Sequence, residues 1–481
     1  MISPFSVSFL LFGGALAAPA PSSEVSASAS VSLVGGPAAS LAALSSAFVA
    51  APSASAASSS AAPSGSAGTG SAYSVTPVSA TVAPVATAAN GVAWDPLGDS
   101  TDEAQPVRGG IGAPFAGPSN ELLDHQNPDF LAPPSTDFGS VGAAKWSLSL
   151  SPMRLLSGGW VRQADETVMP LADEMAGAII HLEPGAIREM HWHTIAEWVY
   201  LINGTTQVSA VDQQGRSTFA TANTGDLWYF PPGVGHHLQA TGDAPAEILL
   251  IFKTGLFDAA KTFLVTDWLS HVPFSVIQKN FGVTGTDKFS SIPSKQLYIF
   301  PGEASAPVEP PVAPMNPQGE IPDPFVYPWS QDPVQEFAGG KVRTVDSSTF
   351  KISIAFSAAE VTLEPGAMRE LHWHTTADEW SFFLEGDCRF SVFTETAART
   401  YDMSPGDIGY VPVSSGHYVE NIGNTTARFL EITDSSEFED ISLTQWLALT
   451  PPEIVKAHFG VDDETVAALS KTKNRVVSGS G

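Results

Sequence analysis

Residues 184–193 read Pro-Gly-Ala-Ile-Arg-Glu-Met-His-Trp-His, and residues 365–374 read Pro-Gly-Ala-Met-Arg-Glu-Leu-His-Trp-His. The two stretches begin 181 residues apart (365 − 184), and the sequence around them repeats at the same offset. An internal repeat of this length indicates that one folded unit is present twice. The other matching pairs are Gly158-Gly159 with Gly339-Gly340, Glu183 with Glu364, Gly225-Asp226 with Gly406-Asp407, and His236 with His417.

Each copy has the sequence pattern of an all-β domain. In the first copy, short apolar runs recur at regular spacing over about residues 146–254, and turn residues such as Asn203-Gly204, a hairpin signal, separate them. This pattern predicts a β-barrel or sandwich. A helical stretch follows in both copies, with Thr266 and Thr444 as the expected N-caps and a glycine near each helical end. We therefore expect two β-domains, each followed by a short helical hairpin.

Changes in composition mark the expected limits of the domains. Residues 1–18 contain an apolar run that ends in small residues, which predicts a secretory signal peptide and a protein outside the cell or in the cell wall. Residues 19–140 are rich in Ala, Ser and Pro and predict a disordered arm. We expect the first β-domain and its hairpin at 141–300, a Pro-rich linker at 301–328 and the second domain at 329–477. No later segment is long enough to span a bilayer.

The composition argues against several classes of partner. The chain of 481 residues has 50 Asp and Glu against 22 Lys and Arg, which gives a formal net charge of −28. Such a balance argues against nucleic acid and against anionic membrane surfaces. The single cysteine, Cys388, cannot form an intrachain disulfide, and we expect it to be a small buried residue. Asn203 and Asn424 begin N-glycosylation sequons in predicted turns.

Both copies contain the same set of metal-ligand side chains. Residues i and i+2 of a strand point to the same face, so the two histidines of each His-Trp-His project together. A carboxylate follows four or five residues later, and another histidine lies farther along the chain. Three imidazoles and one carboxylate suit Mn, Fe, Zn, Ni or Cu and leave an octahedral ion two open positions. The predicted ligands are His191, His193, Glu197 and His236 in the first copy, and His372, His374, Glu379 and His417 in the second.

At these motifs the chain resembles the bicupin oxalate decarboxylase and oxalate oxidase family, in its secreted fungal form. The resemblance covers about residues 146–477 and implies two cupin β-barrels, one Mn2+ in each, oxalate as substrate, O2 as co-substrate or cofactor, and a homo-oligomer, a hexamer in the family. Arg188 and Arg369 match the arginines that face the substrate. Glu431 matches a family carboxylate, which is a candidate acid or base and could equally be a buried partner of Arg369.

The segment after the first barrel differs from that of the family's decarboxylases. Those enzymes have Ser-Glu-Asn-Ser before a threonine, and the glutamate delivers the proton that forms formate. Here the segment is Asp258-Ala259-Ala260-Lys261-Thr262, with alanine in the place of glutamate. Alanine cannot transfer a proton, so the sequence favours an oxalate oxidase that produces CO2 and H2O2. Two alternatives remain: an oxalate decarboxylase in which Asp258 or Glu431 supplies the proton, and a non-catalytic secreted bicupin that binds metal.

Overall fold

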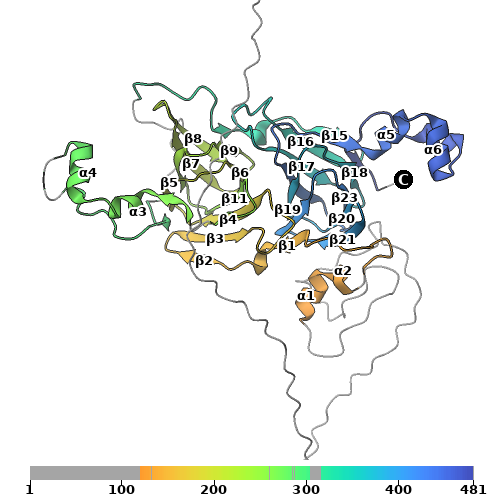
Figure 1. Ribbon diagram of the computed structural model, residues 1–481, viewed down its shortest axis with the longest axis horizontal. Coiled ribbons are helices and arrows are strands. Elements are labelled where there is room, and N and C mark those ends of the chain that lie inside the picture. Colours follow the sequence, from red (N-terminus) through yellow and green to blue (C-terminus); the bar gives the residue numbers. More distant parts are fainter. Residues whose placement is uncertain are drawn as a thin grey trace, which may run out of the picture. The chain divides into compact units, whose positions relative to one another are not determined.

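The computed structural model describes residues 120–131, 133–258, 261–283, 285, 288–303 and 316–479. In this part of the chain most elements are strands, and they form two β-barrels, one for each sequence repeat (Figure 1). This confirms the expected all-β bicupin architecture. The predicted signal peptide and most of the predicted arm lie outside the described residues.

The first barrel is built from two antiparallel sheets. One has the strand order β14-β9-β6-β11-β4-β3-β2, and the other has the order β12-β5-β10-β7-β8, with β13 paired to β5. Its strands are β2 (Arg154–Leu156), β3 (Gly159–Ala164), β4 (Ala176–Leu182), β5 (Ile187–Trp192), β6 (Glu197–Asn203), β7 (Thr205–Val211), β8 (Ser217–Asn223), β9 (Leu227–Phe230), β10 (Gly235–Ala240), β11 (Ala246–Phe252), β12 (Phe263–Leu264), β13 (Ile299–Phe300) and β14 (Val326–Tyr327).

The second barrel repeats this plan. Its sheets have the orders β1-β22-β19-β24-β17-β16-β15 and β21-β20-β23-β18-β25, with β26 paired to β18. Its strands are β1 (Lys145–Ser147), β15 (Gln335–Phe337), β16 (Gly340–Val345), β17 (Ser357–Leu363), β18 (Met368–Trp373), β19 (Glu379–Glu385), β20 (Cys388–Thr394), β21 (Ala397–Met403), β22 (Asp407–Val411), β23 (Gly416–Asn421), β24 (Ala427–Thr433), β25 (Ile441–Ser442) and β26 (Val476–Val477).

The repeated Gly-Gly pair and Asn203-Gly204 have different roles in the structure. Gly159 and Gly340, from the repeated Gly-Gly pair, have φ near 150°, and a Cβ there would lie about 2 Å from a carbonyl oxygen of the next strand. Asn203-Gly204, in contrast, does not form the expected hairpin. It joins β6 of one sheet to β7 of the other, because β6 pairs with β9 and β11 while β7 pairs with β8 and β10.

The two barrels share part of their apolar core. Trp198 of β6 and Trp380 of β19 are fully buried members of a single hydrophobic cluster that draws residues from both barrels. An ion pair between Lys253 and Asp434, which are equivalent positions of the two repeats, also joins the barrels. Cys388 is buried in the core of the second barrel, as expected, and burial raises the pKa of its thiol well above the usual value.

Strand pairing does not follow the domain limits expected from composition. Strand β1 lies before the first barrel in sequence but pairs with β22 of the second. Strand β14 lies in the predicted linker but pairs with β9 of the first barrel, and Ile321 and Phe325 beside it belong to that barrel's core. Each barrel therefore takes an edge strand from outside its expected range, because backbone pairing at a sheet edge does not depend on which domain supplies the strand.

Short helices follow each barrel. They are α3 (Val265–Ser270) and α4 (Phe274–Phe281) after the first, and α5 (Leu443–Leu449), α6 (Pro452–Phe459) and α7 (Asp463–Ala468) after the second. Helices α4 and α6 end at Gly282 and Gly460 in the left-handed conformation, as expected. The predicted N-caps are wrong: Thr266 and Thr444 lie inside the helices, and Ser442 caps α5 by accepting a hydrogen bond from Gln445 N. No helix of the described residues is long and apolar enough to cross a membrane.

Residues 120–140, the end of the predicted disordered arm, pack against the second barrel instead. The segment contains α1 (Glu121–Gln126), α2 (Pro128–Leu131) and a bridge between Phe138 and Ala398. Asp129 is buried and accepts a hydrogen bond from Asp402 N at 3.3 Å, with an Arg399 guanidinium nitrogen 3.7 Å away. These contacts involve few residues, and the sequence around them is polar. Composition therefore did not predict that this segment packs against a barrel.

The buried Asp129 predicts that the free energy of unfolding depends on pH. Burial raises its pKa from 3.8 to about 6, so its contribution to stability is full below pH 4 and is lost as the pH rises through about 6. A shift of about two pKa units corresponds to roughly 3 kcal/mol. We expect Asp129→Asn to gain stability relative to wild type by roughly 2–3 kcal/mol between pH 4 and 7.5, as measured by denaturant unfolding.

The exposed Asp243 supplies the control for this measurement, because its carboxylate lies at the surface. Asp243→Asn should show a constant difference from wild type over the same pH range. Parallel curves for Asp129→Asn and wild type would contradict the role given to Asp129.

Candidate metal centres

The first barrel brings its four predicted ligands together at one point. His191 lies near the end of β5, His193 directly follows that strand, Glu197 begins β6, and His236 lies on β10 opposite His191. All four side chains are buried, and their ligand atoms lie within 4.8 Å of one another. The prediction that these residues form one cluster is therefore confirmed.

The second barrel forms the same cluster from His372, His374, Glu379 and His417, again within 4.8 Å. Here the carboxylate lies one residue later in the chain than the 181-residue offset requires. The residue at the strict offset, Asp378, instead accepts hydrogen bonds from Tyr410 Oη at 2.5 Å and from Val413 N at 2.7 Å. The extra residue between the strands thus places Glu379 in the cluster and Asp378 outside it.

Backbone carbonyls determine the tautomer of all six histidines. The Nδ1 atom of each ring lies 2.6–3.0 Å from a carbonyl oxygen, which can only accept a hydrogen bond. Each Nδ1 therefore carries the proton, and each Nε2 presents its lone pair to the centre of the cluster. This hydrogen bond from the second ring nitrogen is typical of metal-bound histidine.

Unsatisfied polar atoms at both centres fit a bound metal ion. Within the described residues, His236 Nε2, His372 Nε2 and Glu197 Oε1 are buried and have no hydrogen-bond partner. Other ligand atoms crowd together: His193 Nε2 lies 3.1 Å from Glu197 Oε2, and His374 Nε2 lies 2.8 Å from Glu379 Oε2. Buried polar atoms without partners are costly, and a cation at the centre would satisfy all of them at once.

The protonation states of the first centre suit metal binding. Burial, followed by the nearby Arg188, lowers the pKa of His191 well below its usual value, and burial lowers the pKa of His236 to about 3. Burial alone would raise the pKa of Glu197, but its hydrogen bond to His193 and the neighbouring positive charges lower it overall. Neutral imidazoles and an ionised carboxylate are the forms that coordinate a divalent ion.

Arg188 lies beside the first centre without a carboxylate partner among the described residues. Its Nη1 donates to the Tyr298 carbonyl oxygen and its Nη2 donates to Thr262 Oγ1, both at 3.3 Å. The guanidinium carbon lies 3.8 Å from the centre of the Tyr298 ring. Arg188 is 2% exposed, so a positive charge without a direct carboxylate partner among the described residues is buried next to the metal ligands, where Glu197 and Glu189 act on it only at longer range.

Arg369, the equivalent residue of the second barrel, is paired with two carboxylates. Its Nε donates to Glu431 Oε1 at 3.0 Å, and its Nη2 donates to Glu431 Oε2 at 3.2 Å and to Asp440 Oδ2 at 2.7 Å. Burial alone would lower the pKa of Arg369, but these two carboxylates raise it above its usual value. Of the two roles considered for Glu431, the structure shows the buried partner of Arg369.

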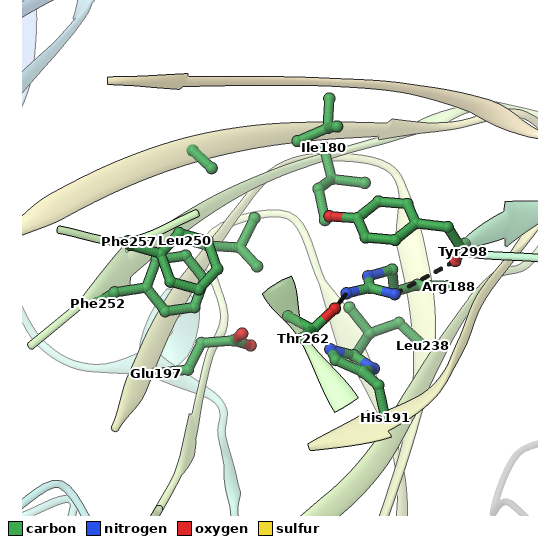
Figure 2. A pocket seen from close by; sticks show the side chains of 12 residues that line it. Ile180, Arg188, His191, Glu197, Leu238, Leu250, Phe252, Phe257, Thr262 and Tyr298 are labelled. Atoms are coloured by element: carbon green, nitrogen blue, oxygen red, sulfur yellow. Dashed lines mark hydrogen bonds between the residues drawn. The ribbon is translucent and has the colours of Figure 1, made fainter. Parts of the chain in front are cut away.

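A small cavity lies between Arg188 and the metal ligands of the first barrel. Its volume is about 10 Å³, which is room for about one water molecule. Figure 2 shows the rings of Phe252 and Phe257 on one side, close to Glu197, and Arg188 under the Tyr298 ring on the other. The two phenylalanine rings are stacked with their centres 3.4 Å apart, so the wall facing the arginine is apolar and excludes water.

The predicted lid residues lie only partly within the described chain. Asp258 is partly exposed, forms an ion pair with Lys261 (3.3 Å) and does not line the cavity. Thr262, at the end of the segment, does line it. Ala259 and Ala260 lie outside the described residues.

Sequence reasoning missed a buried glutamate beside the arginine of each barrel, Glu189 and Glu370. Glu189 Oε2 accepts from Tyr298 N at 2.7 Å, and Glu189 Oε1 accepts from Thr266 N at 2.9 Å. It thereby fixes the residue that stacks on Arg188. In the second barrel, Glu370 Oε2 accepts from Ser442 Oγ at 2.6 Å. The signal was present in the sequence, because an Arg-Glu pair precedes His-Trp-His in both copies.

Comparisons with known proteins agree with this geometry. The cupin family model matches residues 150–288 and 329–467. Oxalate decarboxylase OxdC of Bacillus subtilis is 44% identical over 377 residues, which cover 78% of this chain and 97% of that protein. A probable oxalate decarboxylase of Arthroderma benhamiae is 40% identical over 78% of this chain and 93% of its own length, and an oxalate decarboxylase of the same organism is 36% identical.

Solved structures give the same result. A mutant of Bacillus subtilis OxdC superposes with a TM-score of 0.75 at 44% identity, over 78% of this chain and 100% of the other. Another solved structure of the Bacillus subtilis protein comes from work on its Mn(II) centres.

The ligand assignment predicts how two neighbouring histidines differ. His236→Ala removes a ligand, so the purified chain should retain one metal ion instead of two after dialysis, as measured by elemental analysis. His237→Ala is the matched control, because the Nδ1 of His237 lies 2.6 Å from Ser209 Oγ and not in the cluster. Two ions per chain in the His236 variant would refute the assignment.

Proposed function

The chain belongs to the bicupin oxalate decarboxylase family, and from this membership and the geometry of its sites we propose that it is a manganese-dependent enzyme that degrades oxalate. Manganese suits a site of three imidazoles and one carboxylate. The first barrel holds it through His191, His193, Glu197 and His236, and the second through His372, His374, Glu379 and His417. Manganese with O2 supplies the one-electron chemistry that starts cleavage of the oxalate C–C bond.

The observation that carries this proposal is the buried Arg188 beside a complete ligand set. A guanidinium without an ionic partner in an apolar pocket attracts a carboxylate and holds it through two parallel hydrogen bonds. Thr262 and Tyr298 orient the guanidinium from either side, and Phe252 with Phe257 keeps water away from the reacting carbon atoms. The small size of the cavity argues against a bulky substrate. We therefore place turnover in the first barrel.

Relatives named oxalate decarboxylase support decarboxylation to formate and CO2 as the reaction. Formate requires delivery of a proton to carbon by a positioned acid. Glu197 is the one carboxylate among the described residues that line the cavity, and it is a metal ligand. We infer that the acid comes from the segment between Phe257 and Thr262, where Asp258 is the acidic residue.

Oxidation of oxalate to CO2 with formation of H2O2 is the second candidate reaction. It is supported by the sequence of the same segment, Asp258-Ala259-Ala260-Lys261, which has alanine where the family's decarboxylases have glutamate. The ion pair of Asp258 with Lys261 also directs this carboxylate toward the segment itself.

We also propose that the protein is secreted and forms a homo-oligomer. Secretion rests on the apolar leader in residues 1–18, and assembly, as a hexamer, rests on the family resemblance alone.

Product analysis decides between the two reactions. Manganese-loaded protein is incubated with oxalate in mildly acidic buffer under air, and formate and H2O2 are measured together. We expect consumption of oxalate with formate as the main product. Peroxide near one per oxalate would instead establish the oxidase, and no turnover with both metal sites filled would support a non-catalytic metal-binding bicupin.

Rebuilding the segment tests its control of the products. The fourfold change Asp258→Ser, Ala259→Glu, Ala260→Asn and Lys261→Ser introduces an acid at the position that the decarboxylases use. The ratio of formate to peroxide should rise, because the added glutamate delivers the proton. An unchanged ratio would show that this segment does not select the reaction.

Removal of the Arg188 charge should weaken substrate binding. A charge-assisted hydrogen bond contributes about 1.5–3 kcal/mol, so we expect Arg188→Gln to raise KM for oxalate by roughly 10- to 100-fold. Arg188→Lys should recover only part of the loss, since lysine cannot make the two parallel contacts. The control is Arg216→Gln in the β7–β8 turn, where Arg216 pairs with Asp212. A KM unchanged by Arg188→Gln would exclude Arg188 from the binding site.

A further inference from the structure

We propose that the second barrel contains a latent oxalate site, which Glu431 and Asp440 keep closed by occupying Arg369 in place of a substrate. This inference rests on the proposed function, since it takes oxalate as the ligand of the first barrel. We refer to Glu431 and Asp440 together as the carboxylate clamp.

The clamp makes the kind of contact that a dicarboxylate would make. Three hydrogen bonds join Glu431 to Arg369 at 3.0–3.3 Å, and Asp440 adds a fourth at 2.7 Å. Both carboxylates and the arginine are at least 93% buried. The remaining guanidinium nitrogen, Nη1, has no hydrogen-bond partner in the described part of the chain, and a single nitrogen cannot hold a carboxylate through two parallel bonds.

Strand register identifies the residue of the first barrel that corresponds to Glu431. Glu431 pairs with Ala359 and Ser381, and Leu250 pairs with Ala178 and Val199 at the matching positions of β11. Leucine thus occupies the first barrel's counterpart of the clamp glutamate, and it lines the cavity.

The counterpart of Asp440 is Thr262, which is not the residue that the 181-residue offset selects. Phe263 and Ile441, the next residues, pair with Trp192 and Trp373 at equivalent points of β5 and β18. Thr262 contacts Arg188 Nη2 as Asp440 contacts Arg369 Nη2. The first copy has 12 residue steps from Leu250 to Thr262 and the second has 9 from Glu431 to Asp440.

The clamp is therefore the main difference between two otherwise equivalent centres. The second centre has the same three histidines, the same carboxylate and the same arginine as the first. Two neutral residues beside Arg188 are replaced by two acids beside Arg369, and Lys473 and Arg475 hold Asp440 in place with nitrogen–oxygen distances of 2.6 and 3.8 Å. A carboxylate held at the arginine also repels a dianion.

The test counts oxalate binding sites. Wild type and the isosteric variant Glu431→Gln/Asp440→Asn are loaded with two manganese ions per chain, and oxalate is titrated in oxygen-free buffer by calorimetry. We expect one oxalate per chain in wild type and two in the variant. In parallel, oxalate should change the electron paramagnetic resonance signal of one manganese ion in wild type and of both in the variant.

A matched control removes the same charges elsewhere in the barrel. Glu360 and Glu385 hold Arg428 at 3.0 and 2.7 Å, away from the metal ligands, so Glu360→Gln/Glu385→Gln should still bind one oxalate. One site in both the clamp variant and wild type, or two sites in wild type, would overturn the proposal. A wild type that neither binds nor consumes oxalate would refute the proposed function instead. In that case the comparison of the clamp variant with wild type would still show whether removing the clamp creates an oxalate site.

A reciprocal variant tests the proposal even if the clamp variant does not fold or does not bind manganese. Thr262→Asp introduces a carboxylate beside Arg188, and Thr262→Asn supplies a neutral control of the same shape. The aspartate should weaken oxalate binding in the first barrel at least ~10-fold relative to the asparagine. Equal affinities in the two variants would overturn the clamp as an anion-excluding device.

Discussion

The hydrogen bond from histidine Nδ1 to a backbone carbonyl is the interaction on which both centres depend. In four of the six histidines the acceptor is the carbonyl two residues earlier in the same strand or turn, so local backbone geometry orients each ring. With Nδ1 protonated, every Nε2 lone pair points toward the centre of its cluster. The barrel strands then need only the correct register to bring the rings together.

The two barrels show how one scaffold produces two electrostatic environments. The metal ligands are of the same types in both barrels, yet Arg188 faces leucine, threonine and stacked phenylalanines while Arg369 faces two carboxylates. Burial makes this difference large, because the interior screens charge weakly. A loop shorter by three residue steps brings Asp440 to the arginine of the second barrel, and the longer loop brings Thr262 to the arginine of the first.

The two barrels are joined by a shared apolar cluster. Trp198 and Trp380 lie one residue after the ligands Glu197 and Glu379, and both indole rings are buried in the cluster that joins the barrels. The strands that carry the ligand carboxylates are therefore held on one face by their own centre and on the other by the opposite barrel. Packing at this shared core fixes the position of each carboxylate, which a metal site requires to within a fraction of an ångström.

The sequence by itself determined the repeat, the all-β architecture and the eight metal ligands, because periodicity and ligand chemistry are local properties of the chain. Only the tertiary structure placed Glu431 and Asp440 on Arg369, assigned β1 and β14 to the barrels that they complete, and packed residues 120–140 on the second barrel. These features depend on strand register, on the length of loops and on contacts between residues far apart in sequence. An offset of 181 residues cannot reveal them, since one inserted residue turns each following side chain of a strand to the opposite face of its sheet.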